Sequence, residues 1–188
     1  YIKEASEYVK WLLHECRSAE DGAENLQVMY GLRGQRVLTE EILSHFEGYK
    51  GSKPVRIGNA AFGQKQWDIY GGILDTMWRL HRMRKDYALS AHTWVILRSF
   101  VDHVVKIWQE PEEGLWEVRG GRNHFMHSKV RCWVALDRAL KLANAYGFDC
   151  EWERWEQARE VIRQEIMEKG WSDRKQSFVQ SFGSENLD

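Results

Sequence analysis

The chain has 188 residues, of which 43% are hydrophobic and ten are tryptophan, enough apolar side chain to bury a single domain. The formal net charge is −1, with the 27 Lys and Arg spread along the sequence, which argues against a nucleic-acid-binding or membrane-binding surface. No apolar run approaches the roughly 20 residues that span a bilayer. Three cysteines without Cys-x-x-Cys spacing predict neither a disulfide framework nor a zinc site, and favour a reducing, cytoplasmic compartment.

Hydrophobic residues recur at three- and four-residue steps along most of the chain, which predicts an all-α protein. Five helices are expected, over residues 2–17, 64–85, 90–109, 127–146 and 151–169. The side chains expected to face the core are Ala5, Val9, Leu12 and Cys16, then Trp67, Tyr70, Leu74, Met77 and His81, then Trp94, Leu97, Val101, Val104 and Trp108, then Val130, Trp133, Leu140 and Ala143, and finally Trp152, Trp155, Ile162 and Ile166. Gly147 is expected to cap the fourth helix at its C-terminal end.

The segments between these helices are of unequal length. Leu26–Gly31 is expected to be a short strand or an extended piece, Gly31–Gly34 a turn, and 35–63 a long irregular stretch, which in a compact domain is usually functional. Short links make antiparallel neighbours. We therefore expect the long loops, at 20–63, 110–126 and 170–188, to gather at one end of the helices and line a cleft.

The first candidate site is Trp116-Glu117, which lies in an irregular segment between two predicted helices. An indole offers a flat apolar platform to a sugar ring, and a carboxyl group can protonate a glycosidic oxygen. The plainer interpretation is an exposed loop carboxylate beside an anchoring tryptophan. The pair alone favours this plainer interpretation, and the neighbouring motifs decide between the two.

The second candidate is the segment Gly58–Asp68, where Asn59, Gln64 and Asp68 precede or open a helix. Amide and carboxylate groups are good hydrogen-bond partners for sugar hydroxyls. The alternative is helix capping, because Asn and Asp favour helix N-termini. Asp68 lies too deep in the pattern for a simple cap, so both interpretations stay open.

The third candidate is the segment from His124 to Lys129. Two histidines three residues apart, His124 and His127, lack a third clustered ligand, so no metal is predicted. Lys129 at the start of a helix opposes the helix dipole, which suggests that a carboxylate or a ligand holds it there. No Gly-rich phosphate loop follows a strand, so no organic cofactor is predicted either.

Seven motifs in a fixed order resemble one known family. They are Leu26-Gln-Val-Met-Tyr-Gly31, the segment Gly48–Ala61, Gly63-Gln-x-Gln-x-Asp-x-Tyr-Gly71, Gly114-Leu-Trp-Glu-Val-Arg-Gly120, His124-Phe-x-His-Ser-Lys-Val130, Cys132-Trp-Val-Ala-Leu-Asp-Arg138 and Phe178-Val-Gln-Ser-Phe-Gly183. Together they resemble the prokaryotic branch of glycoside hydrolase family 15, which holds glucoamylases, glucodextranases and trehalase-like enzymes. The resemblance covers nearly the whole chain.

The resemblance implies an (α/α)6 barrel of twelve helices, of which residues 1–188 would form one partial domain of about five to six helices, truncated at both ends. It also implies inverting release of a terminal α-D-glucosyl unit from maltose, starch or dextran ends, or trehalose, without a cofactor. Glu117 matches the general acid of the family and Trp116 the residue beside it. Asn59, Gln64 and Asp68 match a cleft-lining segment, and the motif positions of Arg119, His124 and Lys129 are taken as substrate or site-shaping contacts.

Two family features are missing from the sequence. The Trp-Pro-Arg-Asp motif that grips the terminal glucose is absent, and the second catalytic Glu of the family lies well past the Phe178 motif, beyond Asp188. We therefore expect the rest of the barrel to lie outside this polypeptide, and the 188 residues alone to be inactive. Two alternatives stay open: a non-catalytic toroid that binds a partner, and another sugar enzyme on the same toroid, such as a phosphorylase or an epimerase.

Overall fold

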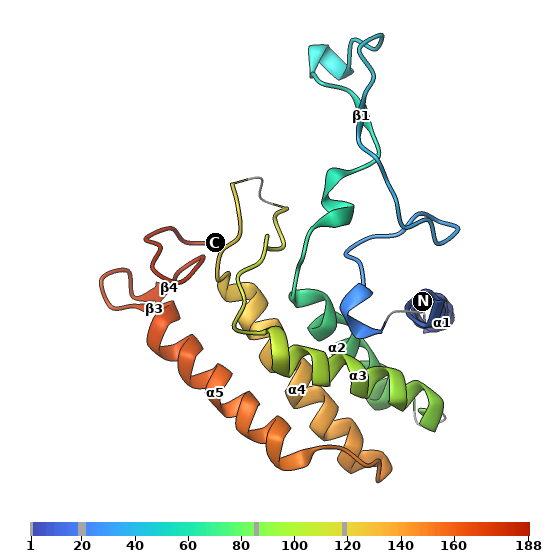
Figure 1. Cartoon of the computed structure of the whole chain (residues 1–188), viewed down its shortest axis with the longest axis vertical. Coiled ribbons are helices and arrows are strands. Elements are labelled where there is room, and N and C mark those ends of the chain that lie inside the picture. Colours follow the sequence, from blue (N-terminus) through green and yellow to red (C-terminus); the bar gives the residue numbers. More distant parts are fainter. Residues whose placement is uncertain (1, 19–21, 85–86, 118–119) are drawn as a thin grey trace. The chain divides into compact units, whose positions relative to one another are not determined.

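A computed structural model describes residues 2–18, 22–84, 87–117 and 120–188 (Figure 1). The chain divides into two compact units, one made of residues 1–26 and 66–188 and a smaller one of Gln27–Lys65. The larger unit holds five helices: α1 (Ile2–Ser18), α2 (Asp68–Met83), α3 (Ala91–Ile107), α4 (Met126–Tyr146) and α5 (Trp152–Gly170). All five predicted helices are confirmed to within a few residues, and with them the all-α class. That residues 1–188 form one domain stays a prediction.

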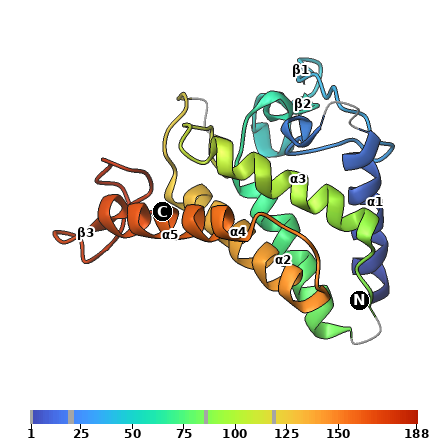
Figure 2. The same ribbon diagram turned by 60° about the horizontal axis from the view of Figure 1, so that its bottom comes forward.

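The core of the larger unit is built around α4, which lies between α2 and α5 in both views (Figures 1 and 2). Cys132 lies against the carbonyl of Trp67, and Arg138 pairs with Asp75 further along. The contacts advance in the same direction on both helices, so α2 and α4 run parallel, while α5 returns alongside α4 (Figure 1). This is the arrangement expected of part of an α/α barrel.

Most of the predicted core side chains are buried, Leu12, His81 and Trp133 are half-buried, and two are exposed. Val130 is 38% exposed and Trp152 is 42% exposed, so the prediction that they face inward was wrong. Val130 lies beside the buried face of α4, which passes through Cys132 and Leu136, and Trp152 is the first residue of α5. Trp155, one turn later, is fully buried and donates its indole N–H to Asp102. The side chains of Ala5 and Cys16 lie outside the described part of the structure.

Helices α2 and α4 touch backbone to backbone at Gly71. A Cβ atom at this position would lie 2.2 Å from the carbonyl oxygen of Arg131, closer than any real contact. At the neighbouring Gly72, the nearest atom to an added Cβ is the far end of the Arg131 side chain, at 3.4 Å, which can move away. The absence of a side chain at Gly71 therefore sets the distance between the two helices.

This contact gives a test of the packing. Gly71→Ala should destabilise the full-length protein by about 1–3 kcal/mol or more, because two helix backbones must move apart. Gly72→Ala, the matched control, should be neutral or stabilising by up to about 1 kcal/mol, because alanine is the better helix former. Thermal unfolding measures both variants. Equal effects from the two would contradict the close approach.

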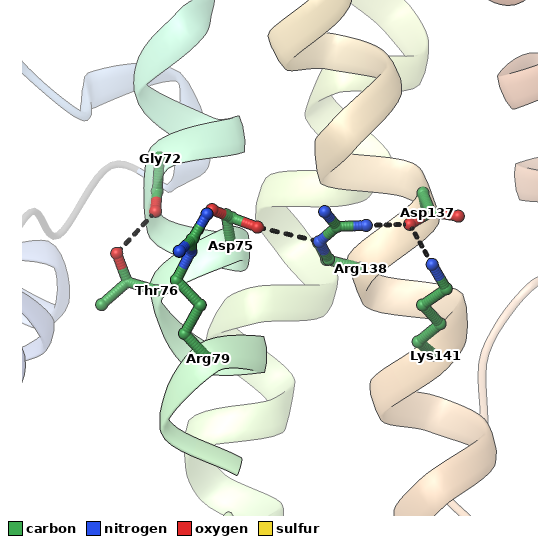
Figure 3. A network of polar contacts seen from close by, with 7 residues as sticks. All are labelled: Gly72, Asp75, Thr76, Arg79, Asp137, Arg138 and Lys141. Carbon is green, nitrogen blue, oxygen red and sulfur yellow. Dashed lines mark hydrogen bonds and ion pairs between the residues drawn. The ribbon is translucent and has the colours of Figure 1, made fainter. Parts of the chain in front are cut away.

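A chain of ion pairs joins the same helices on the side shown in Figure 3. Asp75 of α2 accepts from Arg79 at 2.7 Å and from Arg138 of α4 at 2.8 Å. Arg138 also pairs with Asp137, which in turn accepts from Lys141 at 2.7 Å. Burial alone would raise the pKa of Asp75, but the hydrogen bonds from the two guanidinium groups outweigh it and hold this pKa below its usual value.

The lowered pKa fixes the sign of a pH effect. The pairs of Asp75 stabilise the fold above the pKa of the unfolded carboxyl, about 3.9, and this stability is lost as the pH falls through the lower folded value. Asp75→Asn should therefore cost about 1–3 kcal/mol at pH 7, and the difference from wild type should shrink below about pH 4. The exposed pair of Glu160 and Arg163 supplies the control, Glu160→Gln, which should change the melting temperature little. An Asp75→Asn deficit that stayed constant down to pH 3 would refute this account.

Two of the three predicted loops meet. Phe125 forms an isolated β-bridge with Ser181, the Met126 amide donates to the Gln180 carbonyl at 2.9 Å, and the Phe182 amide donates to the His124 carbonyl at 3.0 Å. The second of these loops contains the hairpin of β3 (Trp171–Ser172) and β4 (Ser177–Phe178), paired antiparallel. The prediction that loops 110–126 and 170–188 gather is confirmed.

The third loop, 20–63, falls mostly in the smaller unit. The turn at Gly31–Gly34 is confirmed by an amide-to-carbonyl bond of 2.9 Å, whereas residues 26–31 form no strand. Gln27 instead donates its side-chain amide to the carbonyls of Arg36 and Phe62. A short antiparallel pair, β1 (Glu41–Ile42) with β2 (Arg56–Ile57), was not predicted. Three 3-10 turns, at Ala23–Asn25 in the larger unit and at Tyr49–Gly51 and Ala60–Gly63 in the smaller one, complete the elements.

Within the described ranges, none of the helices combines the length and the apolar character needed to cross a bilayer.

Candidate active site

The loop that holds Trp116 and Glu117 is closed at its base. The backbone groups of Glu112 and Asn123 exchange two hydrogen bonds, of 2.9 and 2.8 Å, which join the two ends of the loop. Inside it, Gly114 has a φ of +78°, and a Cβ there would lie 2.8 Å from the ring of Phe125. Only glycine fits this turn, which explains why the Trp-Glu pair follows a glycine.

The two predicted residues lie side by side on this turn with different exposure. Trp116 is 66% exposed, and its indole N–H donates to Asp188 at 2.7 Å. Glu117 is half-buried, and its amide donates to the Gly114 carbonyl at 3.1 Å. Its φ of 51° is unfavourable for a side-chain-bearing residue, and such conformations concentrate at functional sites. Lys50 and Gln176 share this φ in other turns, so the conformation supports a site only together with the motif.

Another acidic residue of the loop, Glu112, is completely buried. Its carboxylate accepts the Gly114 amide at 2.9 Å. Burial, together with a smaller contribution from the nearby Asp68, raises the pKa of Glu112 to about 7 against the opposing effects of the Gly114 amide, Ser128 and Trp67. The Ser128 hydroxyl thus lies close to the carboxyl, although outside strict hydrogen-bond geometry. The sequence did not reveal Glu112, because Pro111–Gly114 has the composition of a solvated helix stop.

Asp68 occupies the first position of α2 and is buried. Burial raises its pKa, and the nearby His127 and Arg131 oppose the rise. One carboxylate oxygen of Asp68 and one of Glu112 have no hydrogen-bond partner among the described residues. The helix start of α2 therefore places a second desolvated carboxyl group close enough to Glu112 for the two charges to interact.

Lys129 is only 2% exposed, and its ammonium group donates to the carbonyls of Trp108 and Glu110 at the end of α3. A cation suits the C-terminal end of that helix, which explains its place at the start of α4. His124 is half-buried, stacks on Phe182 with ring centroids 6.0 Å apart, and has a pKa lowered by burial and by Lys129. Lys129 is thus held at the end of α3, and His124 lies where the two loops meet.

The remaining predicted residues are Asn59, Gln64 and Arg119. Asn59 and Gln64 belong to the smaller unit, where Asn59 caps a 3-10 turn by accepting the Ala61 amide at 2.9 Å and Gln64 ends that turn. The capping role that the sequence left open therefore holds for Asn59. Arg119 lies outside the described residues. The substrate contacts of all these residues stay predictions.

The described residues offer no competing site at the loop. No group of three or more His, Cys, Asp or Glu side chains in the described ranges is arranged to hold a metal ion. A groove of about 710 Å³ is lined by residues of α1, α2 and α3, including Lys3, Val9 and Leu80, and by none of the predicted site residues.

Comparison with known proteins identifies the family of the chain. The sequence model of glycosyl hydrolases family 15 matches residues 1–188, so the chain belongs to this family of glycoside hydrolases. It is 40% identical to the trehalases of Mycobacterium tuberculosis and Mycolicibacterium smegmatis, in each case over 99% of this chain and 27% of the relative. It is 31% identical to the trehalase of Thermoplasma volcanium, over 100% of this chain and 29% of the relative. The chain therefore spans little more than a quarter of these relatives, and no solved structure matches it.

The burial of Glu112 predicts a pH-dependent stability. A carboxyl group whose pKa rises from 4.5 to about 7 on folding stabilises the fold most below pH 4.5, and that stability is lost as the pH rises to about 7. Glu112→Gln should therefore gain stability relative to wild type across this window, by about 3 kcal/mol at most. Melting temperatures of the full-length protein at pH 4.5, 6 and 8 measure it. The control Glu113→Gln removes a neighbouring acid that pairs with Arg122, and should keep the wild-type trend. A Glu112→Gln advantage that did not grow with pH would count against a buried, protonated carboxyl.

Proposed function

We propose that the full-length protein containing this chain is a trehalase-type glycoside hydrolase that releases a terminal α-D-glucosyl unit, with Glu117 as its general acid. The observation that carries the proposal is the loop itself. An exposed indole and a half-buried carboxyl lie next to each other, in the Trp-Glu motif of the family to which the whole chain belongs. Trehalose is the first substrate to test, because the relatives named above are trehalases.

In the proposed reaction, the Glu117 carboxyl gives its proton to the glycosidic oxygen as the bond to the anomeric carbon breaks. A second carboxylate, supplied by a segment outside these 188 residues, takes a proton from a water molecule that attacks the opposite face of the sugar. The two carboxyl groups of such an inverting pair stand about 6.5–9.5 Å apart, which leaves room for that water. The anomeric configuration is therefore inverted, and the 188 residues alone do not turn over substrate.

The other residues are proposed to hold the sugar or to shape the cleft. Trp116 offers its exposed ring face to the apolar side of a pyranose. His124, on the seam between the two loops, and Arg119 beside the acid are proposed as hydroxyl contacts. Lys129 and Asp68 are buried, so they act by fixing the loop and helix ends rather than by facing solvent.

The proposal predicts the fate of each anomer. The full-length protein should convert trehalose initially into one β-glucose and one α-glucose, because only the transferred unit inverts, and maltose or dextran ends into β-glucose. Glu117→Gln should lower turnover at least about 100-fold, because the amide cannot donate the proton. Polarimetry or NMR during the first turnovers distinguishes the anomers.

Glu113→Gln serves as the control for this assay and should keep turnover close to wild type. Turnover that depends on added phosphate and yields a sugar phosphate would replace hydrolysis by phosphorolysis. Full activity in Glu117→Gln, or α-glucose as the sole first product, would refute the proposal.

A further inference from the structure

The turn that presents Glu117 is held by a side chain from its own loop. The Glu112 carboxylate accepts the amide of Gly114, and the carbonyl of Gly114 accepts the amide of Glu117. Two hydrogen bonds, of 2.9 and 3.1 Å, thus connect the buried carboxyl to the backbone of the proposed acid. Both bonds belong to the turn whose last residue is Glu117.

We propose that Glu112 is a positioning residue of the glycosidase site: its buried carboxyl clamps the Gly114 amide and so fixes the turn that aims Glu117 at the glycosidic oxygen. This inference rests on the proposed function, because it assigns Glu112 a role in the same reaction. Glu112 itself is fully buried, so it acts through the backbone and not on the sugar.

The carboxyl group lies beside the starts of both parallel helices. The start of α2 contributes Trp67 and Asp68, and the start of α4 contributes Ser128. Lys129 and Cys132 of α4 also lie within electrostatic reach of Glu112. The backbone of Glu112 is fixed independently, through its two bonds to Asn123. The backbone of Glu112 is therefore fixed by Asn123, and its buried carboxyl is directed by the hydrogen bond from the Gly114 amide.

Burial of an acid here is unfavourable, which argues that the group is kept for what it contacts. A desolvated carboxyl with a raised pKa, beside a second carboxyl, destabilises the fold at neutral pH. An apolar side chain of similar size would fill the space without that penalty but could not accept the Gly114 amide. The half-buried acid next to it, Glu113, pairs with Arg122 at 2.9 Å.

The test separates the aim of the acid from the rest of catalysis. The full-length wild type, Glu112→Met, Glu112→Gln and Glu113→Met are compared on two substrates. One is the disaccharide that the wild type hydrolyses fastest, and the other is α-D-glucosyl fluoride. Fluoride leaves with little proton donation, whereas the sugar that leaves a disaccharide needs a proton on its oxygen. An acid that points the wrong way therefore slows hydrolysis of the disaccharide selectively.

Glu112→Met removes the acceptor but keeps the volume, and should lower kcat on the disaccharide about 10–100-fold with KM nearly unchanged. On the fluoride, the rate of Glu112→Met should stay within about threefold of wild type. The same limit holds for Glu112→Gln and for the control Glu113→Met on both substrates. Glu112→Gln is expected to rescue because its amide oxygen still accepts the Gly114 N–H.

A proportional loss on both substrates, or no loss, in a folded Glu112→Met protein would overturn the inference. Glu117→Gln in the same assay separates this failure from that of the proposed function. Full disaccharide hydrolysis by Glu117→Gln would refute the proposed role of Glu117 as the general acid. If Glu117→Gln is inactive while Glu112→Met is active, only the clamp is wrong.

A second measurement tests the hydrogen bond to the Gly114 amide even if Glu112→Met does not fold. Hydrogen exchange of the wild type, followed by mass spectrometry, should show protection in the peptide that contains Gly114 and less in the segment around Gly121. Equal, fast exchange in both segments would show that the Gly114 amide is not held.

Discussion

The close approach of α2 and α4 at Gly71 is the constraint on which the site depends. Because no side chain separates the two backbones there, the parallel helices begin next to each other. The start of α2 supplies Trp67 and Asp68, and the start of α4 supplies Ser128 and Lys129, all near the base of the loop that carries Glu117. The ion pairs of Asp75 and Arg138 hold the same two helices together further along. A packing contact between two helices thus helps to fix the frame of the loop that carries Glu117.

The polar groups beneath the loop differ from an ordinary apolar core. Asp68, Ser128 and Lys129 are buried at two helix starts, and Glu112 is buried in the loop that precedes α4. Such groups are costly to desolvate, and proteins concentrate them where geometry has to be fixed. Lys129 is an example of such a buried group. Its ammonium group donates to the carbonyls at the end of α3, and this fixes the direction in which the loop leaves that helix.

Much of the fold could be predicted from the sequence, because five amphipathic stripes bounded by Gly and Pro leave little ambiguity. Failures arose where a helix face ends: periodicity assigned Val130 and Trp152 to the core, but exposure depends on which helices cover each turn. The hairpins have strands of two residues, too short for an alternating pattern. For the site, the Trp-Glu motif was visible, whereas Glu112 was not, because its burial depends on residues as distant as Asp68 and Ser128.

The most direct test of the account is a crystal structure of the full-length protein with a non-hydrolysable analogue of its disaccharide. We expect a carboxyl oxygen of Glu117 to lie within hydrogen-bond distance, about 3 Å, of the atom that replaces the glycosidic oxygen. Trp116 should lie against the sugar, and Glu112 should still accept the Gly114 amide. An analogue bound with Glu117 out of reach, and with another carboxyl at the glycosidic atom, would contradict this expectation.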